Sequence, residues 1–285
     1  MGVKETESEV TLSFKESEVR VLKFGATVLS WKVKGQEQLW LSDKAILDGS
    51  KAVRGGIPLV FPVFGKATEG PCAKLPQHGF ARNHSWELLG QVQESPLKVQ
   101  FALSPDQLSQ EARDQWPSDF TLIYTLTLDS DSLTTEMSVE NPGQSAFGFN
   151  VLFHTYFRIP SVDSVKVNGL GKVPVHDKVS VSKYQADGEP VTISSEVDRV
   201  YSEIADSNKI EILNGDKVDV DIERTNLPDV VVWNPWIEKA NGLGDFYPKD
   251  GYKTMICVET GSVSSPVNLE PGSSWVGRQV LKAHL

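Results

Sequence analysis

The segment from Phe149 to Arg158 combines groups that can transfer protons or bind a polar ligand with groups suited to a protein core. We expect a strand here, in which successive side chains point to opposite faces. One face would be almost wholly apolar, with Phe149, Val151, Phe153, Thr155 and Phe157. The other would carry Asn150, Leu152, His154, Tyr156 and Arg158. The polar groups of this second face are typical of the lining of a ligand cleft.

His154 and Glu259 are the candidate acid and base. An imidazole titrates near neutral pH, so His154 could donate or accept a proton. Glu259 directly follows the apolar run Met255–Val258, and a carboxylate at the rim of a cleft would have a raised pKa. The same residues would also fit a structural histidine in the core and a strand that emerges into water at Glu259.

Two segments could supply cations for an anionic ligand. The first, Val53–Pro62, places Arg54 before two glycines and contains two prolines, which indicates irregular, tightly packed backbone. The planar guanidinium of Arg54 suits phosphate or carboxylate. The alternative is a structural arginine bonded to a backbone carbonyl or an Asp.

The second segment, Pro76–His84, holds Gln77, His78 and Arg82 around a glycine. This composition suits a loop around a polyhydroxylated or charged ligand, although an ordinary solvated loop is the alternative. No third ligand accompanies His78 and His84 at a helical or hairpin spacing, so we expect no metal site.

Three further candidates are less distinctive. Trp233 and Trp236 could form platforms for sugar rings or belong to the core, and Asp198 could equally be a surface acid. The sequence lacks a phosphate-loop motif, a dinucleotide-binding fingerprint and a nucleophile elbow, so nucleotide and covalent chemistry have no support.

Charge and cysteine content narrow the partners and the compartment. The formal net charge is −10, whereas nucleic acid and anionic membranes need a cationic face, so neither is an expected partner. Met1–Val10 is rich in Glu and lacks the apolar core of a signal peptide, and no apolar run approaches a membrane span. Cys72 and Cys257 lie far apart and imply no disulfide framework. We therefore expect a cytoplasmic protein.

Short alternating runs separated by turn residues recur along the chain and predict an all-β fold of large antiparallel sheets. Val10–Phe14 and Val19–Phe24 are typical of a hairpin. The alternation in Phe120–Leu128 continues, after a polar turn, in Leu133–Val139, which predicts a second antiparallel pair.

Helices should be few and short. The best candidate is Asp106–Arg113, with Ser104 as its N-cap and Pro105 at its first position. The sequence shows no repeat, linker or low-complexity tract, so we expect one β-sandwich domain over residues 1–285, with about residues 1–8 as a flexible tail.

Four segments together resemble the glucose-6-phosphate 1-epimerases, or hexose-6-phosphate mutarotases, of the aldose 1-epimerase superfamily. The segments are Arg54–Pro58, Gln77–Arg82, Phe153–Phe157 and Val232–Trp236. Cys257–Glu259 falls where that family carries its catalytic Glu, and the match runs from about Gly25 to the C-terminus. The resemblance implies a galactose-mutarotase-like β-supersandwich with the sugar in a cleft on its concave sheet.

The resemblance assigns His154 as the catalytic His and Glu259 as the catalytic Glu, with no metal or cofactor. Glu259 would remove the proton from the C1 hydroxyl of a hexose 6-phosphate while protonated His154 donates to the ring oxygen. Rotation about C1–C2 in the open aldehyde, followed by closure, gives the other anomer. Thr260 stands where Pro is expected in some relatives, which bears on local backbone shape.

The substrate contacts follow from the same resemblance. Arg54 and Arg82 match the arginines that hold the phosphate, and Gln77 and Asp198 match other substrate contacts. His78 is added as a cleft residue. The expected partner is a small phosphosugar and the expected state a monomer. A free-aldose mutarotase, a non-catalytic carbohydrate-binding protein and a glycoside hydrolase are the alternatives; the last would want a second carboxylate.

Overall fold

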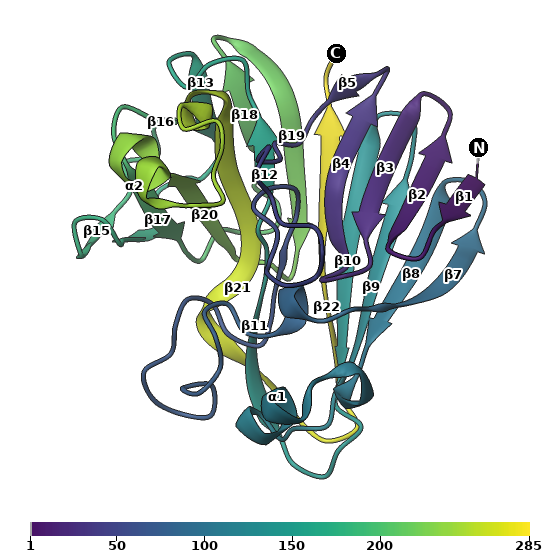
Figure 1. Ribbon diagram of the computed structural model, residues 1–285. Coiled ribbons are helices and arrows are strands. Elements are labelled where there is room, and N and C mark those ends of the chain that lie inside the picture. The colour runs from purple at the N-terminus through teal and green to yellow at the C-terminus, as the bar shows by residue number, and fades with distance from the viewer. Residues whose placement is uncertain (1) are drawn as a thin grey trace.

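The computed structural model describes residues 2–285, whose strands form three sheets in which every ladder is antiparallel (Figure 1). The first sheet follows chain order: β1 (Gly2–Glu5), β2 (Glu9–Phe14), β3 (Ser17–Leu22), β4 (Thr27–Val33) and β5 (Gln36–Glu37). The second has the order β16 (Val191–Thr192), β13 (Val165–Asn168), β18 (Ile210–Asn214), β19 (Lys217–Thr225), β22 (Ser274–Ala283), β10 (Ser132–Glu140), β9 (Thr121–Leu128), β8 (Leu97–Leu103) and β7 (Glu87–Gln93). The third has the order β15 (Ser182–Gln185), β14 (Pro174–Asp177), β17 (Val197–Tyr201), β20 (Asp229–Asn234), β21 (Met255–Leu269), β11 (Phe147–Phe153) and β6 (Leu59–Val60), with β12 (Tyr156–Arg158) also paired to β21. The predicted all-β class is confirmed.

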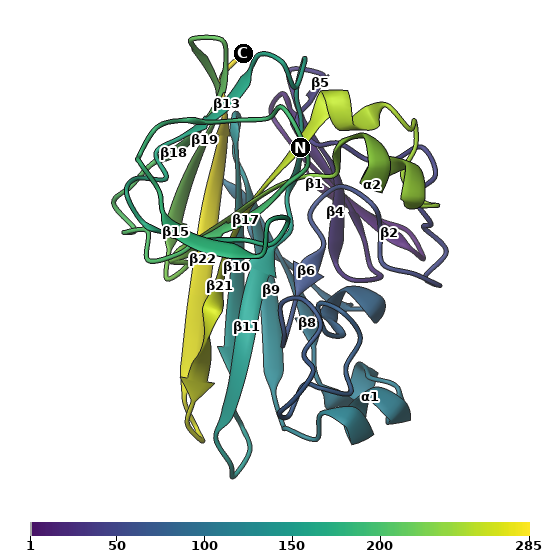
Figure 2. The same ribbon diagram turned by 90° about the vertical axis from the view of Figure 1, so that its left-hand side faces the viewer.

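The first and third sheets both pack on the second, nine-stranded sheet. Figure 1 shows β1–β5 in front of β7–β10, and Figure 2 shows β11 and β21 beside β9, β10 and β22. Apolar side chains from all three sheets belong to one continuous core, which includes Leu12 of β2, Tyr124 of β9 and Val258 of β21. The predicted pairings β2–β3 and β9–β10 are both present.

The amino terminus differs from the prediction. Residues 2–5 were expected in a flexible tail but form β1, which pairs with Val10–Ser13 of β2. The pairing occurs because β2 would otherwise leave its outer backbone groups without partners, and Val3 packs against the core. Met1 lies outside the described residues.

The predicted helix Asp106–Arg113 is also wrong as a single element. Ser104 and Gln107 form a capping box that closes a 3-10 turn, with the Ser104 N–H donating to Gln107 Oε1 at 2.7 Å. Ser109 is then extended and caps a new helix by accepting from the Ala112 N–H. The helices are α1 (Gln110–Gln115) and α2 (Trp236–Gly242), and the 3-10 turns are Ala81–Asn83, Pro105–Gln107 and Gly251–Thr254. None of the helices in residues 2–285 has the length and apolar character needed to cross a membrane.

A cluster of aromatic rings holds together the two segments that were expected to supply cations. Phe61 lies with its ring centroid 5.7 Å from that of Phe80 and 5.5 Å from that of Phe149 of β11. The Phe80 N–H donates to the Phe61 carbonyl at 3.0 Å, and Phe61 forms a parallel bridge with Gly79. Each such ring pair contributes about 0.5–1.5 kcal/mol beyond its buried area. Val53–Pro62 and Pro76–His84 are therefore fixed beside β11.

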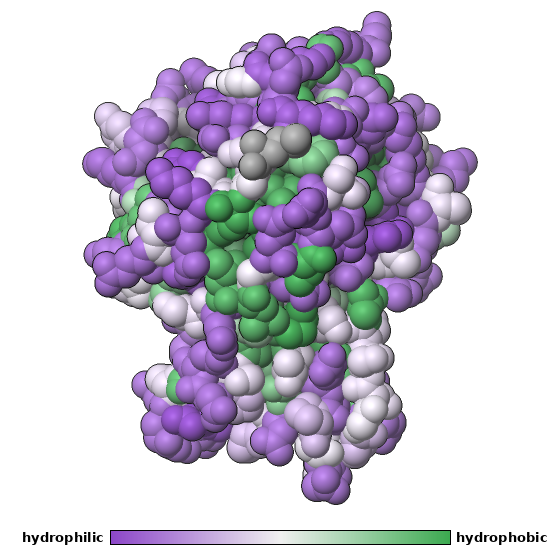
Figure 3. Space-filling view, turned by 90° about the vertical axis from the view of Figure 1, so that its right-hand side faces the viewer, coloured by the Kyte–Doolittle hydropathy of each residue, from purple (hydrophilic) through white to green (hydrophobic). Residues whose placement is uncertain are grey.

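The sheet edges are exposed on the side of the molecule that carries β1 and β7. Figure 3 shows an apolar area on this face, and Leu89 and Val92 of β7 are 48% and 52% exposed. The pairing of β7 with β8 is interrupted twice by register shifts. Such irregularities weaken an edge as a template for strand addition.

Candidate active site

The long strand predicted over Phe149–Arg158 is interrupted at its centre. β11 ends at Phe153 and β12 begins at Tyr156, and both pair with β21 in one register, Phe153 with Thr260 and Tyr156 with Cys257. The register continues across the gap, so His154 stands directly opposite Glu259. Residues opposite each other on neighbouring strands have Cβ atoms about 4.5–5.5 Å apart. The register therefore brings His154 and Glu259 together although they are 105 positions apart in the sequence.

The expected separation of faces is retained across this break. Phe149, Val151, Phe153 and Phe157 belong to the main core. Leu152 and Tyr156 belong instead to a second apolar cluster on the outer face of the sheet, together with Trp40, Trp233 and Phe246. His154 therefore lies on the outer face, between aromatic groups.

A single cavity on this outer face collects every residue that the sequence singled out as a site residue. These are Arg54, Gln77, His78, Arg82, His154, Asp198 and Glu259. Trp233 also lines the cavity, whereas Trp236 packs against Tyr252. Placement in one cavity is what the predicted roles require, and the roles themselves stay predictions.

His154 and Glu259 form the floor of the cavity. His154 Nδ1 lies 3.4 Å from Glu259 Oε1, and Glu259 is only 2% exposed. His154 Nδ1 and Glu259 Oε2 are buried and have no hydrogen-bond partner within residues 2–285. Buried polar atoms are normally paired, so two adjacent unpaired ones are suited to a ligand's hydroxyl groups. Glu259 was expected at a rim; it is instead buried.

Burial acts on both members of the pair in opposite directions. It raises the pKa of Glu259 well above its usual value, and nearby Asp198 adds to the rise. It lowers the pKa of His154 well below its usual value, and His78, Arg82 and Arg54 lower it further. These opposite shifts favour a neutral pair in which the proton resides on the carboxyl group.

Aromatic rings fix the orientation of the imidazole. The His154 ring stacks on Tyr156 with a centroid distance of 4.8 Å and an interplanar angle of 10°. His78 and Trp233 meet it edge-on, at 5.8 and 6.1 Å. This packing restricts rotation of the ring and excludes water from two of its sides.

Arg54 enters the cavity from an irregular segment that packs closely on β4. Gly56 has φ +66°, and a Cβ there would stand 2.0 Å from the Val28 carbonyl oxygen, so only glycine fits. Arg54 Nη1 donates to the Tyr156 hydroxyl at 3.1 Å, and Nε donates to Asp245 Oδ1 at 3.2 Å. The cation of Arg54 is thus partly neutralised.

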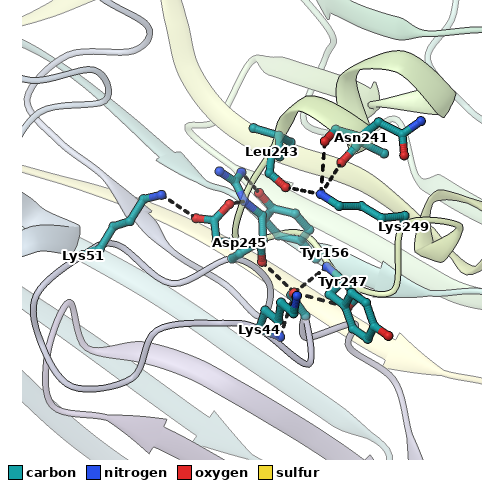
Figure 4. A network of polar contacts seen from close by, with 11 residues as sticks. Lys44, Lys51, Tyr156, Asn241, Leu243, Asp245, Tyr247 and Lys249 are labelled. Carbon is teal, nitrogen blue, oxygen red and sulfur yellow. Dashed lines mark hydrogen bonds and ion pairs between the residues drawn. The ribbon is translucent and has the colours of Figure 1, made fainter.

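Asp245 is itself shared between two cations. Lys51 Nζ lies 2.8 Å from its second oxygen, and Figure 4 shows Asp245 between Lys51 and Tyr156. Sequence analysis missed Asp245, which lies 191 residues beyond Arg54 in an unremarkable loop, and no local pattern marks it.

Arg82 is the less neutralised arginine. It follows Ala81 in a short 3-10 turn, and its Nη2 donates to the Gln77 carbonyl at 3.0 Å. Its Nε is buried with no hydrogen-bond partner, and no carboxylate in residues 2–285 forms an ion pair with it. Burial and the neighbouring Arg54 cation lower the pKa of Arg82 to about 10, which leaves it charged at neutral pH.

His78 closes the loop that carries Gln77. Its backbone has φ +67°, its N–H donates to the Gly65 carbonyl at 2.7 Å, and its Nδ1 accepts from the Gly65 N–H at 3.2 Å. The acceptor role of Nδ1 assigns the hydrogen to Nε2. Burial lowers the pKa of His78 to about 2, with a contribution from Arg82, so the ring is neutral.

Two lysines also line the cavity, and sequence analysis predicted neither of them. Lys178 follows β14, and its Nζ lies 3.8 Å from the centroid of the Phe64 ring. Lys239 of α2 lies 3.9 Å from Asp198 Oδ2 on β17. Nothing in the local sequence distinguishes either lysine from a surface residue, because only the fold brings them to the cavity.

The cavity floor also contains a set of donor atoms that could hold a metal. A ring nitrogen of His154, Cys257 Sγ and a Glu259 oxygen lie within 4.8 Å of one another. Such donors occur at zinc sites. However, the Arg82 and Arg54 cations are close enough to lower the pKa of His154, and the same positive charge would repel a metal ion bound there. The arrangement fits proton transfer better than metal binding.

The three-sheet fold and the cavity with His154 opposite Glu259 agree with the resemblance to sugar epimerases. The family model for aldose 1-epimerase matches residues 8–282, and the chain belongs to this family. It is an isomerase that interconverts sugar anomers, as the resemblance implied.

Individual relatives and solved structures show which members of the family the chain is similar to. The chain is 36% identical over 269 residues to a protein of Cenchrus ciliaris named "Putative glucose-6-phosphate 1-epimerase", covering 91% of this chain and 79% of that one. The crystal structure of a "putative mutarotase" from Salmonella typhimurium superposes with a TM-score of 0.84 at 28% identity, covering 99% and 93% of the two chains. A galactose mutarotase related enzyme from Lactobacillus acidophilus shares the fold, with a TM-score of 0.76 at 18% identity and 97% coverage of each chain.

Proposed function

We propose that the protein interconverts the α and β anomers of D-glucose 6-phosphate and of related hexose 6-phosphates. One observation carries this proposal: Arg82, which has no carboxylate partner within residues 2–285, shares its cavity with the His154–Glu259 pair. A neutral sugar gives no reason to hold such a cation in the cavity, whereas a phosphate group would supply the missing acceptors. The name of the Cenchrus ciliaris relative also supports this substrate.

In the proposed reaction the pair transfers two protons in opposite directions. Glu259, as the carboxylate, takes the proton of the C1 hydroxyl, and His154, as the imidazolium, gives a proton to the ring oxygen. The C1–O5 bond breaks, the C1–C2 bond rotates in the aldehyde, and attack on the other carbonyl face closes the ring. The roles then reverse, so the pair ends in its starting state. Each positioned group contributes about 10²–10⁴-fold.

The phosphate would also assist the chemistry electrostatically. Arg82 and Arg54 are among the groups that hold the pKa of His154 low. A phosphate dianion between the arginines would offset their charge and raise the pKa of His154, which favours the imidazolium that the reaction needs. Arg82 also lowers the pKa of Glu259, so the same offset would make the carboxylate a stronger base.

Gln77, His78 and Asp198 are proposed as contacts to the sugar hydroxyls. Gln77 and His78 occupy one wall of the cavity, and Asp198 lies near Lys239 on another. Burial raises the pKa of Asp198, and its carboxyl group can accept or donate a hydrogen bond to a hydroxyl.

We further propose one domain over residues 1–285, which functions as a cytoplasmic monomer without a cofactor. The continuous core supports one domain. The irregular edge strand β7 supports a monomer, because it disfavours strand addition between copies. The two free cysteines agree with a reducing compartment.

Exchange NMR between the two anomeric proton signals tests the proposal. We expect the protein to accelerate exchange of glucose 6-phosphate far more than that of glucose at equal concentration. Equal acceleration of both sugars would identify a free-aldose mutarotase instead. Binding without acceleration would identify a carbohydrate-binding protein.

A further inference from the structure

A buried amide lies directly behind the catalytic pair. Gln279 of β22, on the opposite sheet, is fully buried, as are Thr155 and Thr260. Thr260 Oγ1 donates to Gln279 Oε1 at 2.8 Å, and Gln279 Nε2 donates to Thr155 Oγ1 at 3.4 Å. A polar bridge of this kind inside an apolar sandwich requires a reason, because burial of polar groups is otherwise unfavourable.

The two threonines are the immediate neighbours of the catalytic residues. Thr155 follows His154 and Thr260 follows Glu259, so their side chains point to the core when the catalytic side chains point to the cavity. The Gln279 amide therefore joins, on one side of the sheet, the same two backbone positions that carry the acid and the base on the other side.

The backbone at this point needs such support. Residues 154 and 155 lie between β11 and β12, where the regular ladder with β21 is interrupted. The Thr155 N–H donates to the Phe153 carbonyl two residues back, and the Val258 N–H reaches the Thr155 carbonyl only at 3.3 Å. On the side away from β21 the His154 N–H donates to the Pro58 carbonyl at 3.0 Å, so the segment is held there while its contact with β21 is loose.

We propose that Gln279 is a positioning residue, which sets the separation of His154 and Glu259 by bridging Thr155 and Thr260 across the sandwich. This inference rests on the proposed roles of His154 and Glu259. Gln279 touches neither the substrate nor the reacting atoms. It acts by restraining the break between β11 and β12 against β21, and the length of one amide sets the spacing of the two threonine hydroxyls.

The first test is Gln279→Met, which keeps the volume of the side chain but removes both hydrogen bonds. We expect kcat for glucose 6-phosphate to fall about tenfold, because a small misplacement of a catalytic group is costly. KM should change less than about twofold, because the arginines and the cavity wall are untouched. The pH profile of kcat should also shift, since the separation of His154 and Glu259 sets the coupling of their titrations. Unchanged kcat with an unchanged pH profile would overturn the inference.

A triple variant separates positioning from stability. Thr155→Val, Thr260→Val and Gln279→Met together leave no unpaired polar group, so the melting temperature should return toward that of the wild type. If Gln279 positions the pair through hydrogen bonds, kcat stays low in the triple variant. Recovery of kcat together with the melting temperature would show that only packing matters and would refute positioning. If Gln279→Met alone folds poorly, kcat of the triple variant still shows whether Gln279 acts through its hydrogen bonds or only through packing.

Asn141 provides a matched control. It is a buried amide at 2% exposure, whose Nδ2 donates to the Ser145 and Leu269 carbonyls at 2.9 Å, far along β21 from the cavity. Asn141→Leu should lower the melting temperature without changing kcat. An active Glu259→Gln variant would instead reject the proposed function itself, whatever Gln279→Met does.

Discussion

Replacing Arg82 by Met tests the phosphate assignment most directly. The change removes the charge and all N–H donors but keeps most of the apolar length of the side chain. Within residues 2–285 the Arg82 guanidinium makes one hydrogen bond, to the Gln77 carbonyl, and no ion pair. The variant should therefore fold normally.

The expected change in KM follows from the hydrogen-bond donor and the charge that Arg82 offers to a ligand. Its Nε has no partner within residues 2–285, and its charge is not balanced by a carboxylate, unlike that of Arg54, which lies 3.2 Å from Asp245. A hydrogen bond to a charged group contributes about 1.5–3 kcal/mol, and each 1.4 kcal/mol is about tenfold in affinity. We therefore expect KM for glucose 6-phosphate to rise about 10- to 100-fold, with a much smaller change in kcat.

The assay is exchange NMR over a concentration series of glucose 6-phosphate, repeated with glucose. Because Arg82 is assigned to the phosphate alone, KM for glucose should be unchanged. Arg158→Met is the matched control, since Arg158 is the last residue of β12, is exposed and does not line the cavity. An equal rise in KM for both sugars, or no rise for either, would refute the phosphate assignment.

Three further predictions concern charge in and around the cavity. Glu259→Gln should lower kcat by about 10²–10⁴-fold in the same assay. Because folding raises the pKa of Glu259, the wild type loses stability as the pH rises above the ordinary pKa of Glu. Calorimetry should therefore show a higher melting temperature for Glu259→Gln than for the wild type at about pH 8, and no difference near pH 4. A difference that does not depend on pH would contradict this. Lys178→Met removes a cation that lowers the pKa of Glu259, so the acidic limb of kcat/KM should move to higher pH, and an unmoved limb would exclude the coupling. Asp245→Asn leaves Arg54 without its ion pair, so the melting temperature should fall. Inorganic phosphate at about 10–50 mM should raise the melting temperature of this variant more than that of the wild type. Equal rises in the two proteins would count against Arg54 as an anion ligand.

The class of fold and the faces of the central strand could be predicted from the amino-acid sequence alone. Alternation in Phe149–Arg158 predicted which side chains face the core, because a strand places neighbours on opposite sides whatever it pairs with. The motifs around Arg54, Gln77 and His154 indicated the family, since a local pattern of residues survives in the linear chain.

The geometry of the site depends on how the strands pair and the sheets pack, and it could not be predicted from the sequence. The opposition of His154 and Glu259 depends on the register of β11 and β12 against β21, which no local pattern specifies. Asp245 and Lys178 reach the site from separate loops, and Gln279 lies behind it on the opposite sheet, so their local sequences carry no signal. The pKa directions of the pair likewise come from burial and from charges distant in sequence, and these exist only once the sheets have packed.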